Sequence, residues 1–350
     1  MRVPGQGRYS RDMSREDDLR VTVLINTYNY GRFLGRAIDS AIAQTYPASH
    51  TEILVIDDGS TDDTPEVVRR YGDRIRYIRK RRGGQASALG EGIRQAQGDI
   101  LCLLDADDYF YPEKVARVAA AFAGDPEVGL VYDNSNIVDA AGKTVRDVSW
   151  GRTWTYRRVT VSRLPAQLRS LILLGHPWIS MTSSMSLRKT VAEGLVVPED
   201  LFPHSADIFL GIVLPFLAEV QVIETVLTAY VFHGENLVLF RSDPANRELL
   251  KRQLACVRRY IEERCGRRFV TYFGRSLYGA EPDAPWQKQS RLAVYLDDFR
   301  QIARSDVEWS IKRESHLRLL ASLLLPPSLY EGLRRVRVAQ RHLLRSRYGP

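Results

Sequence analysis

The chain of 350 residues has few cysteines and no long apolar run. Its three cysteines, Cys102, Cys256 and Cys265, are an odd number without the spacing of a metal site, so we expect reduced thiols. The longest apolar run, near Leu319–Leu325, is far shorter than the about 20 residues that a membrane-spanning helix needs. Residues 1–18 lack the apolar segment of a signal peptide. These absences predict a cytoplasmic protein without a spanning helix.

Two common nucleotide-binding motifs are also missing. The first predicted strand, Val21–Ile25, is followed by Asn26–Asn29 instead of a Gly-x-Gly-x-x-Gly turn, and the chain has no Walker lysine loop. A Rossmann dehydrogenase is therefore excluded. A nucleotidyltransferase is disfavoured, because it would normally show a glycine-rich basic loop at this position. The lack of spanning helices and of a Gln-x-x-Arg-Trp motif argues against a processive polysaccharide synthase.

Positive charge is concentrated at the end of the chain. The net charge is +8, and Ser328–Pro350 holds six arginines and a single glutamate. Such a local segment does not indicate a nucleic-acid-binding protein. The segment also carries apolar residues at helical spacing, namely Leu329, Leu333, Val336 and Leu343. We expect an amphipathic helix that binds an anionic membrane surface, and the alternatives are packing on the rest of the protein or dimerisation.

The first third of the chain alternates short β-rich runs with helical patterns, which is typical of βαβ units around a parallel sheet. We expect strands at Val21–Ile25, Glu52–Ile56, Ile75–Ile78, Asp99–Leu104, Val128–Tyr132, Val220–Ile223 and Val226–Val231. We expect helices at about Tyr30–Gln44, Gly83–Ala96, Pro112–Phe122, Asp207–Leu217, Leu249–Cys265, Trp286–Ile302 and Ile311–Leu325. The predicted fold class is therefore α/β with a helical C-terminal part.

Acidic residues stand at the ends of two buried strands. Asp57 and Asp58 follow one strand, and Asp105, Asp107 and Asp108 follow another. Ligands of open α/β sheets bind outside the carboxyl ends of the strands, so both clusters should face one site. Two carboxylates one residue apart suit Mg²⁺ or Mn²⁺, which such sites hold together with phosphate oxygens. The alternative is that these acids only cap the following helices.

Five segments of the chain carry a family pattern in register. They are Val23–Asn29, Ser40–Tyr46, Glu52–Thr64, Gly83–Ala88 and Gly98–Tyr109. In this order and spacing they resemble the inverting family 2 glycosyltransferases, which use nucleotide sugars and have the GT-A fold. The resemblance covers about residues 21–122. It implies a GT-A type sheet that binds a nucleotide-diphosphate sugar as donor, with UDP as the first choice of nucleotide.

The resemblance also implies roles for individual residues. The implied donor-binding residues are Asn26, Thr27, Tyr28, Asp58, Gly84 and Asp105. A carboxylate can accept the imide N–H of uracil, and an aromatic ring can stack on the base. Asp107 would be a ligand of Mg²⁺ or Mn²⁺, and His233, in a segment similar to Tyr-Arg-x-His-Gly-x-Asn, would be a further ligand. Packing roles remain the alternative for Tyr28 and His233.

An inverting transfer needs a carboxylate that removes the proton of the acceptor hydroxyl. The family carries this base at the start of a helix ahead of the last core strands, where Ser205–Leu210 stands here. Asp207 is therefore the candidate catalytic base. Glu199 or Asp200 is the next choice, and a simple helix cap is the alternative role of Asp207. We expect His204 to lie on the surface or to contact the acceptor.

The chain departs from the family pattern in its basic and polar residues. Leu89-Gly90 stands where relatives commonly carry Arg-Asn or Leu-Asn, which puts the selectivity for the sugar in doubt. Val231 replaces the arginine of the His233 segment. The stretch Arg79–Arg82 is unusually basic, and it is either a solvated loop or a contact for the diphosphate or an anionic acceptor.

These observations predict three parts of the chain. Residues 1–18 form a flexible N-terminal segment, residues 19–240 a GT-A catalytic domain, and residues 241–350 a helical C-terminal extension with the basic amphipathic tail. Within the domain, 19–135 would bind the nucleotide sugar and 136–240 the acceptor.

The predicted reaction moves a single sugar, with inversion, to a hydroxyl of a saccharide or lipid-linked acceptor in cell-surface polysaccharide or glycolipid biosynthesis. The enzyme would be cytoplasmic or peripheral on the inner face of the cell membrane. A nucleotidyltransferase and an inactive scaffold of a polysaccharide assembly complex are the alternatives, the second disfavoured by the intact acids.

Overall fold

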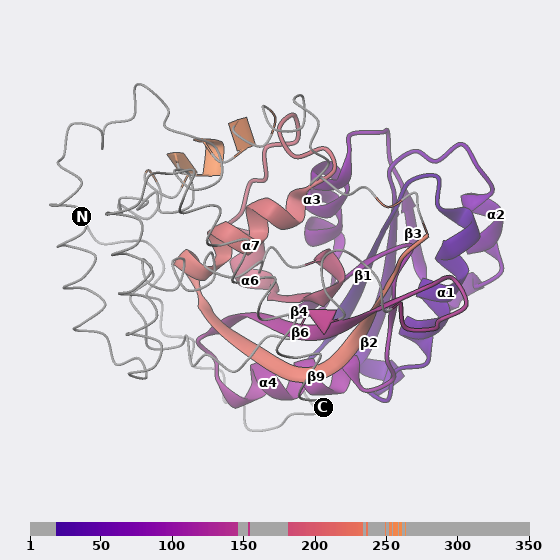
Figure 1. Ribbon diagram of the computed structural model, residues 1–350, viewed down its shortest axis with the longest axis horizontal. Helices are drawn as coiled ribbons and strands as arrows, with labels where there is room; N and C mark the ends of the chain where they lie inside the picture. Colours follow the sequence, from indigo (N-terminus) through magenta and orange to yellow (C-terminus); the bar gives the residue numbers. More distant parts are fainter. Residues whose placement is uncertain are drawn as a thin grey trace, which may run out of the picture.

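The protein is described from a computed structural model, which covers residues 19–145, 153–154, 181–233 and 236 and single helical residues between 249 and 263. These residues form a nine-stranded sheet with helices on both faces (Figure 1). Within this part of the chain, no helix is both long and apolar enough to span a bilayer. The predicted tail and the predicted helices Trp286–Ile302 and Ile311–Leu325 lie outside the described residues.

The sheet is parallel at one side and mixed at the other. Its strands are β1 Val21–Thr27, β2 Thr51–Asp57, β3 Arg76–Arg79, β4 Ile100–Asp105, β5 Tyr109–Phe110, β6 Val128–Val138, β7 Thr153–Trp154, β8 Met185–Arg188 and β9 Glu219–Val231. Their order is β3-β2-β1-β4-β8-β6-β9-β5, and β7 pairs with β6. Strand β1 runs parallel to β2 and β4, whereas β8 is antiparallel to β4 and β6.

The direction of each crossover decides which face a helix covers. The helices are α1 Gly31–Ile42, α2 Thr64–Arg69, α3 Gln85–Gln95, α4 Lys114–Gly124, α6 Lys189–Ala192 and α7 Ala206–Leu217, with 3₁₀ turns η2 Ala48–His50, η3 Gly72–Arg74 and η5 Thr182–Ser184. The chain moves outward from β1 through β2 to β3, so right-handed crossovers put α1 and α2 on one face. It then returns from β3 to β4, which puts α3 on the opposite face. The carboxyl ends of β1 and β4 thus form the point where a ligand of an α/β sheet binds.

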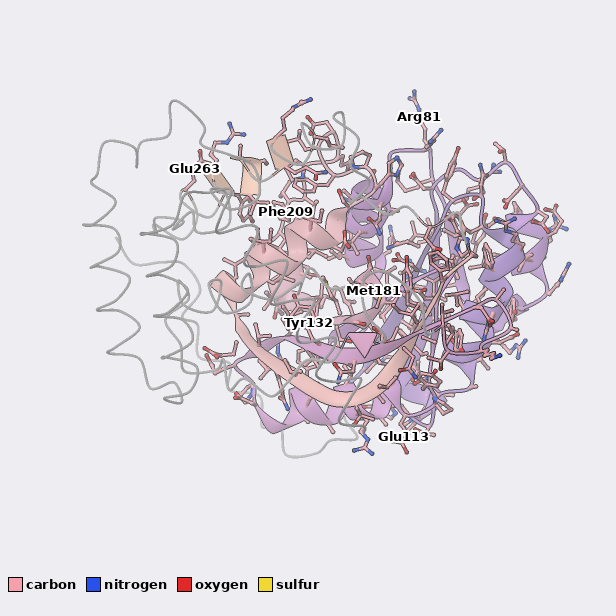
Figure 2. The ribbon with its side chains drawn as sticks, viewed as in Figure 1. Arg81, Glu113, Tyr132, Met181, Phe209 and Glu263 are labelled. Carbon is pink, nitrogen blue, oxygen red and sulfur yellow. The ribbon has the colours of Figure 1, made fainter. Side chains whose placement is uncertain are left out.

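Alternate residues of the central strands serve the two layers. Val23 and Ile25 belong to the cluster of buried residues that includes α1, α2 and α4, whereas Leu24 belongs to the cluster with α3 and α7. Helix α3 lies so close to β1 that a Cβ on Gly92 would come within 2.4 Å of Leu24. Figure 2 shows Phe209 of α7, which belongs to the same cluster as Leu24. Each core strand is therefore buried on both faces, as its continuous apolar sequence predicts.

The structure confirms the predicted strands and helices of the first 122 residues to within three residues at each boundary, whereas the strand predicted at Val128–Tyr132 continues to Val138 as β6. The prediction was wrong for the last two strands, Val220–Ile223 and Val226–Val231, which form the single long strand β9 beside β6 (Figure 1). The irregularity falls in the pairing instead, with register shifts on β6 around Asn134. The described residues of the predicted helix Leu249–Cys265 are helical. Cys102 and Cys256 are buried free thiols, as expected.

Candidate active site

Asn26 and Asp105 mark the centre of the site, at the carboxyl ends of the neighbouring strands β1 and β4. The two residues are directly paired in the register of these strands, so both side chains stand on the α3 face of the sheet. Both polar atoms of the Asn26 side chain, and the hydroxyl of Thr27, are buried without a hydrogen-bond partner in the described structure. Buried polar groups are normally paired, so these three atoms are suited to a ligand.

The two acids that end β2 have different surroundings. Asp57 is fully buried, and its carboxylate accepts hydrogen bonds from the backbone of Ser60 at 2.8 Å and from the hydroxyl of Tyr77 at 2.6 Å. Asp58 accepts from Lys80 at 2.8 Å and from the backbone of Gly83 and Gly84 at 2.9 and 2.6 Å. Asp57 thus has a structural role, and Asp58 fastens the loop that leads into α3.

Gly84 connects this loop to the segment in front of α7. Its φ of +88° favours glycine, and a Cβ at this position would come within 2.8 Å of the carbonyl oxygen of Pro203. The next residue, Gln85, donates its backbone N–H to the same carbonyl at 2.6 Å. Gly84 is therefore needed where two segments of the site touch. A direct contact of Asp58 or Gly84 with the donor stays a prediction.

Tyr28 lies under the predicted basic loop. The guanidinium carbon of Arg82 stands 4.4 Å from the centroid of the Tyr28 ring, which is a cation–π arrangement. Arg79 and Lys80 are engaged elsewhere, since Arg79 donates to the carbonyl of Ser60 and Lys80 to Asp58. Figure 2 shows Arg81 extending outward from this loop. The loop is therefore partly tied down, and a base that stacks on the outer face of Tyr28 has to share that ring with Arg82.

Asp105 is the most perturbed acid of the predicted donor site. Burial, followed by the negative charges of Asp107 and Asp207, raises the pKa of Asp105 to about 7, although part of its side chain is exposed. Its Oδ1 accepts a long hydrogen bond of 3.3 Å from the side chain of Gln85. The Gln85 amide also contacts the hydroxyl of Thr182 and accepts from the backbone of Ala206, the first residue of α7. Gln85 therefore connects Asp105 to the helix that carries Asp207.

Asp107 and His233, the two predicted metal ligands, lie side by side. The Nε2 atom of His233 is 3.0 Å from Oδ2 of Asp107, and both side chains are largely buried. The imidazole packs on Phe33 of α1, with ring centroids 4.4 Å apart. Asn236 accepts from the backbone of His233 at 2.9 Å and donates to the carbonyl of Val231 at 2.9 Å. His233 and Asn236, which follow β9, thus both lie beside Asp107.

The arrangement suits a hard cation that obtains most of its ligands from the substrate. Over the residues that the structure describes, no group of three or more His, Cys, Asp or Glu side chains forms a complete metal cage. One carboxylate and one imidazole, Asp107 and His233, are nevertheless a donor set that suits Mn²⁺. Mg²⁺ likewise takes one or two carboxylates and completes its shell with water and phosphate. Asp107 and His233 therefore fit such a cation.

Asp207 lies in the first turn of α7, near Asp105. Burial raises the pKa of Asp207 to about 6, against hydrogen bonds from backbone N–H groups at the start of the helix that lower it. Its charge contributes to the raised pKa of Asp105, and Gln85 links Asp105 to Ala206, the residue directly before Asp207. The alternative bases Glu199 and Asp200 are exposed, and the charge of Asp200 acts on the thiol of Cys256. His204 is exposed, as expected.

Three contributions to this site were missed at the level of the sequence. Gln85 and Ser183 bind the acids from other segments, and Asp108 accepts hydrogen bonds from Ser183 and from the backbone of Val231. Gln85 carries a sequence signal, because it directly follows Gly83-Gly84 at the start of a predicted helix, and Asp108 belongs to the predicted acidic cluster, although its partners could not be predicted. Ser183 stands in a stretch without periodicity, so nothing in its sequence context indicated a contact with the acids.

The sheet order and the acids at the ends of β2 and β4 define a GT-A type glycosyltransferase fold. The crystal structure of S. aureus TarS 1–349 in complex with UDP-GlcNAc has this fold, with a TM-score of 0.51 and 17% identity, and the match covers 93% of this chain and 92% of that one. A family model, glycosyl transferase family 2, matches residues 22–193. Over these residues the chain is similar to this family of glycosyltransferases.

Relatives differ in how much of their length this chain matches. An uncharacterized glycosyltransferase of Nostoc sp. is 29% identical over 342 residues, which are 94% of this chain and 95% of the relative. An uncharacterized glycosyltransferase of Rickettsia felis is 36% identical over 155 residues, which are 43% of this chain but 25% of that protein. Chondroitin synthase of Pasteurella multocida is 34% identical over 137 residues, 38% of this chain and 14% of the synthase. The chain thus spans nearly the whole length of the Nostoc relative, but a quarter or less of the other two proteins.

Proposed function

We propose that this glycosyltransferase moves one sugar from a nucleotide-diphosphate sugar to a hydroxyl acceptor, with inversion and with help from a divalent cation. The observation that carries the proposal is the link made by Gln85, which donates to Asp105 at the end of β4 and accepts from the backbone of Ala206, the residue directly before Asp207 in α7. The site thus holds one carboxylate on the predicted donor side and a separate buried carboxylate on the predicted acceptor side. Such a separation is what a direct displacement with one base requires.

The donor side offers groups for each part of the nucleotide. The unpaired polar atoms of Asn26 and Thr27 suit the base and ribose, and Tyr28 with Arg82 offers an aromatic and cationic surface for the base. Asp105 and Gly84 border the place of the ribose and diphosphate. A UDP-sugar is the first donor to test, because the S. aureus TarS structure with this fold was solved with UDP-GlcNAc.

Asp107 and His233 would hold Mg²⁺ or Mn²⁺ together with the diphosphate. A bound divalent cation supplies positive charge that stabilises the leaving diphosphate. Asp207 accepts the proton of the acceptor hydroxyl as the oxygen forms its bond to the anomeric carbon and the bond from that carbon to the diphosphate oxygen breaks. With its pKa raised to about 6, Asp207 is ionised at neutral pH and yet more basic than an ordinary carboxylate.

The acceptor is proposed to be a saccharide or a lipid-linked molecule in the assembly of cell-surface polysaccharide or glycolipid. The partial similarity to chondroitin synthase of Pasteurella multocida supports a polysaccharide product. The basic amphipathic tail, Ser328–Pro350, would place the enzyme at an anionic membrane surface, where a lipid-linked acceptor lies.

The proposal is tested with a panel of nucleotide sugars, with and without Mn²⁺. A donor at 100 times its dissociation constant should stabilise the protein by about 2.7 kcal/mol, and Asp107→Ala should abolish the Mn²⁺-dependent part of this gain and the transfer. Asp73→Ala, which changes an exposed acid of η3, is the matched control. Full activity of Asp107→Ala in the presence of chelator would contradict metal dependence, and a product with retained configuration would contradict inversion. Donor binding without turnover would instead indicate an inactive scaffold. Release of pyrophosphate would indicate a nucleotidyltransferase.

A further inference from the structure

The turn that carries the acids after β4 needs support from outside. Asp105, Asp107 and Asp108 lie within four residues, and negative charges so close together repel one another. Hydrogen-bond donors from other segments help to keep these carboxylates in one arrangement. Two donors reach Asp108, the hydroxyl of Ser183 at 2.6 Å and the backbone N–H of Val231 at 3.0 Å.

The hydroxyl of Ser183 in η5 serves two groups of this turn at once. It donates to Oδ2 of Asp108 and accepts the backbone N–H of Asp105 at 3.1 Å. Asp108 also accepts from the backbone of Val231, which is two residues before His233. Through Asp108, the Ser183 hydroxyl is therefore connected to the segments that carry both predicted metal ligands. It ties down the turn that contains Asp107 and the strand end that presents His233.

Ser183 is itself held by a buried ion pair. Its carbonyl oxygen accepts from the ammonium of Lys114 at 3.3 Å, and Lys114 pairs with Asp133 of β6. Thr228 of β9 donates to the same carboxylate at 2.7 Å. All four side chains are completely buried. A serine on such a rigid support has little freedom to follow the turn if the turn moves.

We propose that Ser183 is a positioning residue, which sets the distance between Asp107 and His233 at which a divalent cation and a diphosphate bind. This role rests on the proposed function. It concerns a residue that touches neither substrate nor metal in the proposal, so its loss should weaken the site without unfolding the protein. Partners that orient metal ligands typically contribute 10–100-fold to metal affinity or activity.

Ser184 provides a matched control. It is the next residue, its side chain is also fully buried, and its hydroxyl has no hydrogen-bond partner in the described structure. Ser183→Ala and Ser184→Ala therefore remove the same atom from the same short 3₁₀ turn. They differ in the hydrogen bonds that the lost hydroxyl makes with the turn of acids.

The experiment compares the wild type and the two variants as full chains, with MnCl₂ and UDP as probes. We expect Ser183→Ala to raise the dissociation constant of Mn²⁺ in the presence of UDP about 10–100-fold, measured by electron paramagnetic resonance. Ser184→Ala should bind Mn²⁺ like the wild type, and Ser183→Thr, which keeps a hydroxyl, should recover most of the affinity. The melting temperatures of the two alanine variants should agree.

Equal Mn²⁺ binding by the wild type and Ser183→Ala overturns the role of Ser183 alone. A wild type that binds no Mn²⁺ with UDP overturns the proposed function and this role with it. If Ser183→Ala does not fold, Asp108→Asn takes its place, because it keeps the size of the side chain and removes one acceptor oxygen. Unchanged Mn²⁺ binding in Asp108→Asn then overturns the proposal.

Discussion

Asp207→Asn should slow the transfer and at the same time stabilise the protein. The carboxylate of Asp207 is largely surrounded by protein at the start of α7, and this burial disfavours its charged form. The proposed reaction needs that charged form, because only a carboxylate can accept the proton of the acceptor hydroxyl. Asparagine keeps the shape of the side chain but carries neither the charge nor the basicity.

The size of the stabilisation follows from the pKa of Asp207. Burial raises this pKa from 3.8 to about 6, and the difference corresponds to about 3 kcal/mol at 1.36 kcal/mol per unit. The side chain is partly exposed, and screening by solvent reduces this to about 1–2 kcal/mol. Below pH 3.8 the carboxyl group is neutral in both the folded and the unfolded state, so the variant gains nothing. Between pH 3.8 and 6 the unfolded state ionises first, which lowers the stability of the wild type, and above pH 6 the full gain of the variant is present.

The assay combines unfolding and kinetics. At pH 7 the melting temperature of Asp207→Asn should rise by roughly 2–4 °C, and near pH 4 it should equal that of the wild type. Turnover should fall by about 10²–10⁴-fold with donor affinity preserved, and the turnover of the wild type should decline below pH about 6. Asp200→Asn, at an exposed position before α7, should show neither effect. A variant that is less stable than the wild type at pH 7 would refute the burial argument, and unchanged turnover would refute the assignment of the base.

Two further predictions concern the support of the sheet and the tail. Lys114→Met should lower the free energy of unfolding by about 3–5 kcal/mol, because it leaves Asp133 charged and buried without its partner. In denaturant unfolding, the double variant Lys114→Met with Asp133→Asn should recover most of this loss. A single variant as stable as the wild type would contradict the buried pair. Truncation after Leu325 should abolish flotation of the protein with anionic liposomes and leave its behaviour with neutral liposomes unchanged. Binding to anionic liposomes that does not depend on salt would contradict the prediction that the tail binds a membrane surface.

The sequence predicted the parts of the fold that depend on local pattern. The apolar runs of β1, β2 and β4 are buried on both sides, and the acids directly after them must lie at the carboxyl edge, whatever the rest of the chain does. The exact extent of β9 was not predictable in the same way. Its polar residues Glu224 and Thr225 interrupt the apolar pattern, but the strand continues past them because it stays paired with β6, with shifts of register.

The individual roles of the acids could not be predicted, because partners from distant segments decide them. Asp57 and Asp58 are neighbours in the sequence, yet the first binds a tyrosine within the sheet and the second binds the loop before α3. Asp107 and Asp108 differ in the same manner, since Asp107 contacts His233 whereas Asp108 accepts from Ser183 and from the backbone of Val231. A motif of acids thus predicts where a site lies, but not which carboxylate is left for a ligand.

The hydrogen bonds that some of the acids already make indicate which other carboxylates remain accessible to a ligand. Asp57 and Asp108 are fully buried and have both oxygens occupied by protein donors, so they are suited to support. Asp107 and Asp207 keep some exposure, and no backbone group of another segment donates to either in the described structure. Because a cation or a hydroxyl can approach only such incompletely satisfied oxygens, the hydrogen bonds of the other acids support the proposal that Asp107 binds the metal ion and Asp207 accepts the proton.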